Sequence, residues 1–338
     1  MDKKKKVRLS DIAQKLNIST VTVSKALANK DGVGDDLRKQ IKDIAEEMGY
    51  KVKKNGAAAS KDQATGNIGI LIPSRFFSPD FSFYWYLFNF LSKELLSRNY
   101  YSIMELLPDE NEEKLIMPRM IHDQKVDGMI ILGQTKDSYL EAVKSHYDNF
   151  ILMDFYTNKL HLDSVSDDDF YCSYQLTNYV ISQGHKKLCF VGNFGATTSI
   201  SDRYMGFTKA MYENGLNTDV KDIINDRDSK GLKIDLDIPY KNMPTAFICN
   251  CDETAANLIL LLQEKGYKIP EDISVTGFDN YLPQGRINLE LTTAFIRPED
   301  SAKVAADLII SKINGEPYIK GRHLVSGSLV IKDSVKKL

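Results

Sequence analysis

The spacing of apolar residues in the first fifty positions predicts three short helices. In the first two, apolar residues recur about three or four positions apart: Ile12, Ala13, Leu16, Val23 and Leu27. Only a few polar residues separate the two runs, so a tight turn is expected between them. A third helix is predicted over about residues 35–48 and would end at Gly49, because glycine suits the left-handed conformation that closes many helices. Together these helices would form a small module.

A polar segment, residues 51–66, follows this module. It is dominated by Lys, Asn, Gly, Ala, Ser, Gln and Thr, and no large apolar residue lies between Val52 and Ile68. A segment of this composition has little apolar surface to bury. We interpret it as a linker.

From Ile68 onward, short apolar runs alternate with stretches of helical length. The predicted strands are residues 68–73, 101–106, 128–132, 150–153, 164–166, 188–192, 246–249 and 274–278, with a C-terminal strand near 329–331. The predicted helices are about residues 83–98, 111–123, 138–146, 171–183, 202–213, 253–265 and 299–314. Apolar strands separated by helices indicate an α/β fold with a doubly wound parallel sheet. This segment is too long for one such sheet, so we expect two sheets that share crossovers.

The distribution of charged residues also changes within the linker, between a basic N-terminal part and an acidic remainder. The formal net charge is −2, but the first 61 residues hold 15 Lys and Arg against 8 Asp and Glu, whereas the rest holds 29 against 38. A basic module attached to an acidic body is typical of a nucleic-acid-binding head joined to a domain with another task. The lysines at positions 3–6 account for only part of this excess.

Several function classes are disfavoured by what the sequence lacks. No run of about 18 apolar residues could span a membrane, and the lysine-rich start has no apolar core of a signal peptide, so a cytoplasmic protein is expected. The Cys249–Cys251 spacing is too short for a metal pair, and the five histidines are isolated. The loop from Gly192 to Gly195 lacks the third glycine of a dinucleotide site, and no Gly-x-Ser-x-Gly occurs. We therefore expect no enzyme activity, cofactor or metal.

A series of short motifs runs along the chain. They are Asp11-Ile12-Ala13, Val23-Ser24-Lys25-Ala26-Leu27, Met48-Gly49-Tyr50, residues 66–73, Val126-Asp127-Gly128, Gly184-His185, Arg203-x-x-Gly206-Phe207, residues 269–275, Gly277-Phe278-Asp279 and Leu291-Thr292-Thr293. Each motif is weak alone, but in this order and spacing they resemble the LacI/GalR family of bacterial transcriptional regulators, along essentially the whole length of the chain.

The resemblance implies a helix-turn-helix head, an all-α domain over residues 1–50, and a hinge over residues 51–66. Residues 67–338 would form a two-lobed domain like periplasmic sugar-binding proteins, which closes on a small effector. The lobes would be about 67–162 plus 294–323, and 163–293 plus 324–338. Such proteins bind palindromic operator DNA as dimers. A homodimer is also favoured because the chain stops soon after residues 329–331 without a trailing heptad segment.

For DNA recognition, the family's base-reading positions on the second helix fall on Thr20, Val21 and Lys25. Threonine and lysine can reach base edges by hydrogen bonding, and valine makes only apolar contacts. Most family members carry arginine at the Lys25 position, and lysine lacks its bidentate fork. The implied phosphate-contacting positions are Ser19, Thr22, Ser24 and Asn29. Ser10 is placed at the same interface, although Ser10 and Ser19 can equally be helix caps and Ser24 can simply be exposed.

The hinge departs from the family's pattern. Members usually place a leucine there that wedges into the minor groove, but the matching position here is Ala59 or Ser60. We therefore expect less bending of the operator and more attraction between phosphates and Lys53 and Lys54, together with Lys51. Binding of this kind is strongly salt-dependent.

In the effector cleft, Arg203 matches the family's ligand-clamping arginine and Asp279 matches an acidic acceptor past a strand end. A surface ion pair for Arg203 and a turn role for Asp279 remain open. Asp168 matches a position at the cleft edge, although an acidic loop is usually solvated. Cys251 stands where relatives often place Asn or Ser, and Asp252 is interpreted as a helix N-cap.

The segment 74–86 carries many aromatic residues. We interpret Phe77 and Tyr84 as cleft walls, while packing in the core or a dimer face is the other reading. A sugar is the favoured effector of a repressor for a carbohydrate operon. Alternatives are a nucleobase or nucleoside, a protein corepressor, or a sugar-binding protein without a DNA role.

Overall fold

The computed structural model describes residues 9–16, 18–27, 32–48, 64–77, 82–217, 223–283 and 285–338. The chain forms two compact units, Met1–Ala58 and Ala59–Leu338, which we call the head and the body.

The described part of the head consists of three helices: α1 (Leu9–Leu16), α2 (Thr20–Leu27) and α3 (Asp35–Glu47). Their buried apolar side chains form one core: Ile12, Ala13, Val23, Ala26, Leu27, Val33, Ile41 and Ala45. This core includes most of the residues whose spacing predicted the helices. Helix α1 already begins at Leu9, so Ser10 lies in its first turn and the expected N-cap position is wrong by one residue or more.

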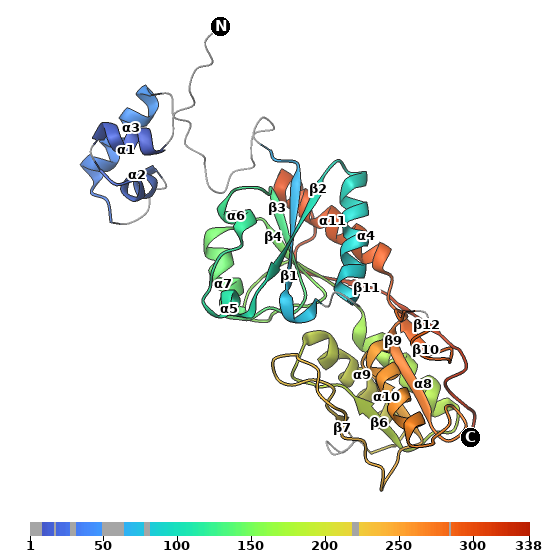
Figure 1. Ribbon diagram of the computed structural model, residues 1–338. Helices are drawn as coiled ribbons and strands as arrows, with labels where there is room; N and C mark the ends of the chain where they lie inside the picture. Colours follow the sequence, from blue (N-terminus) through green and yellow to red (C-terminus); the bar gives the residue numbers. More distant parts are fainter. Residues whose placement is uncertain are drawn as a thin grey trace. The chain divides into compact units, whose positions relative to one another are not determined.

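Two six-stranded sheets form the body (Figure 1), as expected. The first has the order β11-β5-β4-β3-β1-β2 and the second has the order β12-β10-β9-β8-β6-β7. All strand pairs described are parallel except β12 with β10. The strands are β1 (Asn67–Pro73), β2 (Tyr101–Leu107), β3 (Gly128–Leu132), β4 (Phe150–Met153), β5 (Ser164–Asp167), β6 (Leu188–Val191), β7 (Ile223–Ile224), β8 (Ala246–Cys249), β9 (Ser274–Asp279), β10 (Thr292–Phe295), β11 (Arg322–Val325) and β12 (Ser328–Val330).

Helices cover both sheets. They are α4 (Phe83–Ser97), α5 (Asp109–Glu113), α6 (Arg119–His122), α7 (Asp137–His146), α8 (Asp169–Ser182), α9 (Thr198–Glu213), α10 (Asp252–Glu264) and α11 (Pro298–Asn314), with the 3-10 turn η2 (Ser74–Phe76). The central strands β3, β4, β6 and β8 are buried along their whole length, which explains why they read as continuous apolar runs. No helix among the described residues is long and apolar enough to cross a membrane.

The chain crosses between the sheets after β5, β10 and β11. The sequence placed these crossings near residues 162, 293 and 323. The first boundary is wrong, because β5 pairs with β4 and β11 in the first sheet and the crossing follows Asp167. Three connections join the lobes, and we call the part around the first sheet the first lobe and the part around the second sheet the second lobe.

One predicted helix is wrong. Residues 111–123 form two short helices, α5 and α6, instead of one. Leu115 between them has a positive φ of 56°, and Pro118 precedes α6. Proline disfavours helical geometry in the residue before it, so a continuous helix cannot pass through this point.

Candidate functional site: a helix-turn-helix head and a cleft between two lobes

In the head, α2 presents polar side chains from a helix held by its own N-cap. Ser19 Oγ accepts a hydrogen bond from the Thr22 backbone N–H at 3.0 Å, so Ser19 is a helix cap. Thr20 and Lys25 are exposed, while Val23 is fully buried against α1 and α3. Exposed Thr and Lys on a short second helix can reach base edges in a major groove.

Other residues predicted at the DNA interface cannot be placed as side chains. Ser10 lies in α1, and Val21 and Ser24 lie in α2, where only the helix itself is described. Asn29, Lys53, Lys54 and Ala59 lie outside the described residues. Their roles stay predictions.

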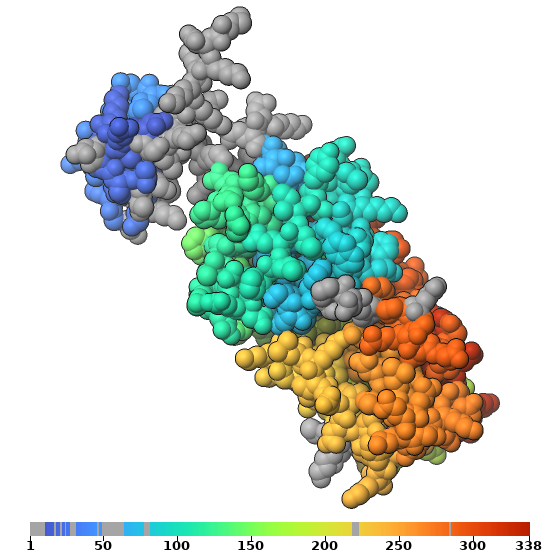
Figure 2. Space-filling view, in the orientation of Figure 1, coloured from blue at the N-terminus to red at the C-terminus, as the bar shows by residue number. Residues whose placement is uncertain are grey.

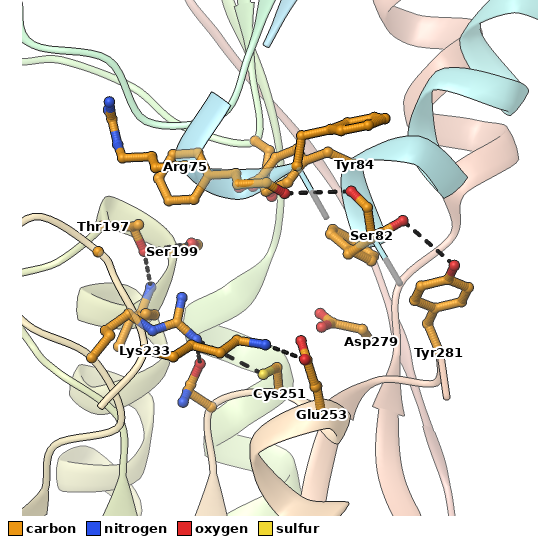
Figure 3. A pocket seen from close by; sticks show the side chains of 18 of the residues that line it. Arg75, Ser82, Tyr84, Thr197, Ser199, Lys233, Cys251, Glu253, Asp279 and Tyr281 are labelled. Carbon is orange, nitrogen blue, oxygen red and sulfur yellow. Dashed lines mark hydrogen bonds and ion pairs between the residues drawn. The ribbon is translucent and has the colours of Figure 1, made fainter. Parts of the chain in front are cut away.

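A cavity of about 440 Å³ lies between the two lobes of the body (Figure 3). Its size is within the range of small-molecule sites. The first lobe contributes Arg75, Phe76, Phe77, Ser82, Phe83, Tyr84 and Asp154, and the second contributes Thr197, Ser199, Ile200, Arg203, Arg227, Gly231, Leu232, Lys233, Asn250, Cys251, Glu253, Asp279, Tyr281 and Arg286. We call this space the inner cavity. It holds five residues predicted for the effector site: Phe77, Tyr84, Arg203, Cys251 and Asp279.

Arg203 is the centre of the polar floor. Its guanidinium donates from Nε to Asp169 Oδ1 at 2.7 Å and from Nη1 to the Asn250 carbonyl at 2.5 Å, and Nη2 lies 3.2 Å from Asp279 Oδ1. It also lies over the ring of Phe278, 3.8 Å from the centroid. Burial alone would lower the pKa of Arg203, but the carboxylates around it raise this pKa, so it stays charged. Arg203 is therefore a buried cation, not a surface ion pair.

A glycine lets Arg203 reach its partners. At Gly206, one turn further along α9, a Cβ would lie 2.2 Å from the Phe170 carbonyl oxygen of α8. The close approach of α9 to α8 brings Arg203 to Asp169, the first residue of α8. The two residues of the Arg203-x-x-Gly206 motif therefore act together. Gly206 allows the close contact between α9 and α8, and this contact positions the Arg203 guanidinium beside Asp169.

Gly206→Ala is expected to lower the free energy of unfolding of the body by about 1–3 kcal/mol, because the new methyl must push backbone away from backbone. Urea unfolding followed by circular dichroism measures this change. Gly195→Ala is a matched control, since a Cβ there would meet no atom nearer than 3.7 Å. Equal stability of both variants would contradict the role given to Gly206.

Two cleft carboxylates project from strand ends of opposite lobes. Asp154 follows β4 and Asp279 ends β9, and both have positive φ, 67° and 99°. Non-glycine residues rarely adopt this conformation, and strain of this kind gathers at functional sites. Asp154 Oδ2 accepts a hydrogen bond from the Tyr84 hydroxyl at 2.8 Å. Burial raises the pKa of both carboxyls, against the opposing effect of Arg203. Asp154 was not predicted.

A second arginine, Arg227, was also missed by sequence reasoning. It forms a bidentate pair with Asp226, at 3.1 Å and 2.8 Å, and donates to Asn250 Oδ1 at 3.3 Å. Asp226 in turn accepts hydrogen bonds from Asn250 Nδ2 and the Thr254 hydroxyl, both at 2.7 Å. Burial would lower the pKa of Arg227, but Asp226 raises it. No motif marks Arg227, and the fold alone brings its loop to the cavity.

Cys251 has the N-cap role that was expected of Asp252. Cys251 is the N-cap of α10, with Sγ accepting from the Thr254 N–H at 3.5 Å, and its sulfur faces the inner cavity. Asp252 is therefore not the N-cap. It is buried in the first turn, where it accepts hydrogen bonds from the Thr293 hydroxyl and the Tyr281 N–H at 2.6 Å and 2.7 Å. Asp252 thus links α10 to β10 and to the segment after β9.

Aromatic side chains form the wall contributed by the first lobe. Phe76 packs on Tyr84 with centroids 5.3 Å apart, and Phe77 meets Trp85 edge to face at 6.1 Å. Asp168 does not line the cavity, because it caps α8 by accepting from the Tyr171 N–H at 3.2 Å. The next residue, Asp169, provides the carboxylate that reaches Arg203.

Most charges in the inner cavity are paired. Arg203 faces Asp169 and Asp279, and Arg227 faces Asp226. Figure 3 shows the pair of Lys233 with Glu253. Arg286, which is exposed at the cavity, donates to the Asn257 side-chain oxygen at 2.9 Å. Arg75 pairs with Asp109 and Glu112 at 3.0 Å and 2.7 Å. No group of three His, Cys, Asp or Glu side chains suited to a metal ion occurs among the described residues. Such a cavity suits a polar but uncharged ligand, with hydroxyls to donate to carboxylates and to accept from guanidinium groups.

Comparisons with known proteins identify both units. Residues 8–52 match the model described as bacterial regulatory proteins, lacI family, and residues 177–335 match that of a periplasmic binding protein-like domain. The HTH-type transcriptional repressor CytR of Escherichia coli (strain K12) is 25% identical, over 98% of this chain and 96% of the relative.

Two solved structures share the fold. The lac repressor dimer bound to operator and an anti-inducer has a TM-score of 0.67 at 18% identity and covers 98% of this chain and 100% of its own. A LacI family regulator from Enterococcus faecium with bound ribose has a TM-score of 0.67 at 21% identity, covering 80% of this chain and 99% of its own. These two structures show the shared fold. The two matched models and the full-length relative identify the chain: it belongs to the LacI family of bacterial regulatory proteins and is a DNA-binding transcriptional regulator.

Proposed function

We propose that this protein is a cytoplasmic repressor that binds operator DNA as a homodimer and is controlled by a small neutral sugar in the inner cavity. The carrying observation is the arrangement of Arg203 with Asp154 and Asp279. Arg203 on α9 offers one fixed donor fork, and Asp154 and Asp279, at strand ends of opposite lobes, offer two acceptors for a ligand between the lobes.

The chemistry of a sugar fits this arrangement. Its hydroxyls both donate and accept, so they satisfy carboxylates and a guanidinium in one molecule. The rings of Phe76, Phe77 and Tyr84 offer apolar faces for its C–H groups. A phosphorylated or carboxylated sugar would be favoured by a buried unpaired cation, but Arg203, Arg227 and Lys233 already face carboxylates. Arg286, which donates to Asn257, is exposed and not buried in the cavity. The relative solved with ribose supports the same class.

Homodimer formation is supported by apolar side chains exposed on the first lobe. Leu96 on α4 and Tyr101 on β2 are 57% and 67% exposed, and Trp85 on α4 is 43% exposed. Burial of these side chains against a second copy would remove their apolar surface from water. A dimer would also present two heads to a two-fold symmetric operator.

The test has two arms. Operator fragments are selected from the host's genome with the purified protein, and ligands are screened by calorimetry with neutral sugars, sugar phosphates and nucleosides. We expect one ligand per chain, a neutral sugar, and a change of at least about tenfold in operator affinity when it binds. Saturable binding of a nucleoside or a sugar phosphate in place of a neutral sugar would overturn the effector class without touching DNA binding.

A further inference from the structure

A second cavity, of about 720 Å³, also lies between the lobes. We call it the outer cavity. Most residues that line it carry polar or charged groups: Arg75, Phe76, Asp109, Glu112, Glu113, Gln134, Thr135, Lys136, Asp137, Ser138 and Lys159 of the first lobe, and Ala196, Ser229 and Lys230 of the second. Among the residues that the structure describes, Arg75 and Phe76 line both cavities, so these two residues mark the boundary between them.

At this boundary the Phe76 ring reaches from one lobe to the other. On its own lobe it packs on Tyr84 and lies close to Gly133, where a Cβ would be 3.3 Å from its Cδ2. On the other lobe it meets Gly231, where a Cβ would be 3.2 Å from its Cε1. The ring of Phe76 therefore touches both lobes and separates the inner cavity from the outer one.

The loop that carries Gly231 is held in a fixed shape. Asp228 Oδ1 accepts from the Lys230 and Leu232 N–H groups at 2.8 Å and 3.0 Å, and Gly231 N–H donates to the Asp228 carbonyl at 3.1 Å. Gly231 has a φ of 85°, which favours glycine. Figure 2 shows the segment around residues 225–240, in yellow, against the blue-green surface of the first lobe.

Different residues of this loop line the two cavities. Arg227, Gly231, Leu232 and Lys233 line the inner cavity, whereas Ser229 and Lys230 line the outer one. The loop of the second lobe and Phe76 of the first thus form one partition. A longer ligand could displace an exposed loop that has no internal hydrogen bonds. The hydrogen bonds within this loop oppose such a displacement.

The outer cavity could accept a further sugar unit if the partition were open. Its charges are mostly paired: Arg75 with Asp109 and Glu112, Lys136 with Glu113 at 3.4 Å, and Lys159 with Asp137 at 3.1 Å. It is thus nearly neutral and rich in hydrogen-bonding groups, like the inner cavity. Because the two cavities have similar polar linings, the Phe76 ring is what prevents a ligand of two sugar units from occupying both.

We propose that Phe76 sets the length of the effector: with the Gly231 loop it confines the ligand to one sugar ring in the inner cavity and excludes a second ring from the outer cavity. This inference rests on the proposed function, because it assumes a sugar in the inner cavity. It assigns Phe76 as a specificity-determining residue for ligand length.

The experiment compares wild type with Phe76→Ala by calorimetry. The probes are neutral monosaccharides (ribose, xylose, glucose, galactose) and disaccharides that extend the bound ring at each hydroxyl in turn. Wild type is expected to bind one monosaccharide per chain and to bind every disaccharide at least about tenfold more weakly, a discrimination that pocket sterics can supply. Phe76→Ala is expected to bind at least one disaccharide as tightly as the monosaccharide.

Phe77→Ala is the matched control, because it loses the same ring from the inner cavity only. It should weaken both ligand sizes alike and keep the length preference. Phe76→Leu, a milder change, should relax the preference partly. Thermal unfolding of each variant checks that the body is folded.

Three results would overturn the inference. They are a wild-type protein that binds a disaccharide as tightly as the monosaccharide, a Phe76→Ala variant with the wild-type preference, and two monosaccharides bound per chain, which would make the outer cavity a site of its own. If wild type binds no sugar at all, the proposed effector class itself fails, and the length inference falls with it. That result is distinct from the other three, in all of which wild type still binds sugar.

Discussion

Replacing Arg203 with leucine is expected to lower the free energy of unfolding of the body by about 3–5 kcal/mol, the cost typical of removing one partner from a buried ion pair. The guanidinium faces two carboxylates, Asp169 and Asp279, and all three side chains are at least nine-tenths buried. Without it, these carboxylates stay in a low-dielectric interior with no cation. The Asn250 carbonyl also loses its donor. Urea unfolding at neutral pH measures the change.

The double variant Arg203→Leu with Asp169→Asn separates charge from packing. It removes the cation together with its closest carboxylate, so it should recover part of the loss seen in Arg203→Leu alone. Arg203→Lys keeps the charge but not the planar fork, and should be intermediate. If Arg203→Leu were within about 0.5 kcal/mol of wild type, as is usual for surface substitutions, the central place given to this cluster would be wrong.

Ligand control should be lost in the same variant under conditions where it is folded. The operator affinity of Arg203→Leu is expected to be the same with and without sugar, while DNA binding itself persists, because the DNA-reading helix belongs to another unit of the chain. This separates an effector-site defect from a general loss of function.

Arg203 and Asp279 were placed in the cleft by the resemblance to the family's motifs, and for Asp279 also by its position at the end of an apolar strand. Both side chains line the inner cavity, and their part in effector binding stays a prediction. Asp154 and Arg227 carry no such pattern. Asp154 is one acid after a short strand, and Arg227 comes from a loop whose path depends on contacts with Asn250 and Asp226.

Errors of one residue arose where a helix begins inside a polar run. In the sequence Asp167-Asp168-Asp169, spacing cannot tell which carboxylate caps the helix and which faces Arg203. In the structure Asp168 caps α8 and Asp169 points inward. The same ambiguity assigned the N-cap of α10 to Asp252 although it is Cys251, because the N-cap is fixed by the point at which the helix begins.

Strands at sheet edges were harder to predict than central ones. The sequence missed β7, β10 and β11. Two of these, β7 and β11, are at an edge of their sheet, and β11 is a mostly exposed Arg-His-Leu-Val run. A strand that is not buried on both faces needs no continuous apolar run, so the signal that located β3 or β8 is absent.

Asp167→Asn is expected to stabilise the body at pH 8 by roughly 1–4 kcal/mol. Asp167 is the last residue of β5, fully enclosed, with Ser301 donating to its Oδ1 at 2.9 Å. Burial, with Asp169 and Asp154 nearby, raises the pKa of Asp167 from 3.8 to about 8. Between about pH 4 and 8 the folded protein therefore holds a proton that the unfolded chain has released.

The sign of the pH dependence follows from that proton. Stability falls as pH rises through this window, because the folded state binds more protons than the unfolded state. Asparagine is neutral at every pH, so its variant should lose this slope. Its advantage over wild type should therefore be largest at pH 8 and vanish near pH 4. Urea unfolding of both proteins at several pH values between 4 and 8 gives the two curves.

Asp163, at the other end of β5, is a matched control of opposite sign. Burial would raise the pKa of Asp163, but hydrogen bonds from Gly321 N–H, Lys312 and Tyr318 lower it. Its charged form therefore favours the folded state, so Asp163→Asn should destabilise at pH 7, and this loss should shrink as pH falls toward the carboxyl's folded pKa. If Asp167→Asn and Asp163→Asn shifted the free energy of unfolding in the same direction at pH 8, the explanation would be wrong. The two carboxyls would then not differ in the way proposed, with Asp167 buried away from a paired cation and Asp163 paired with Lys312.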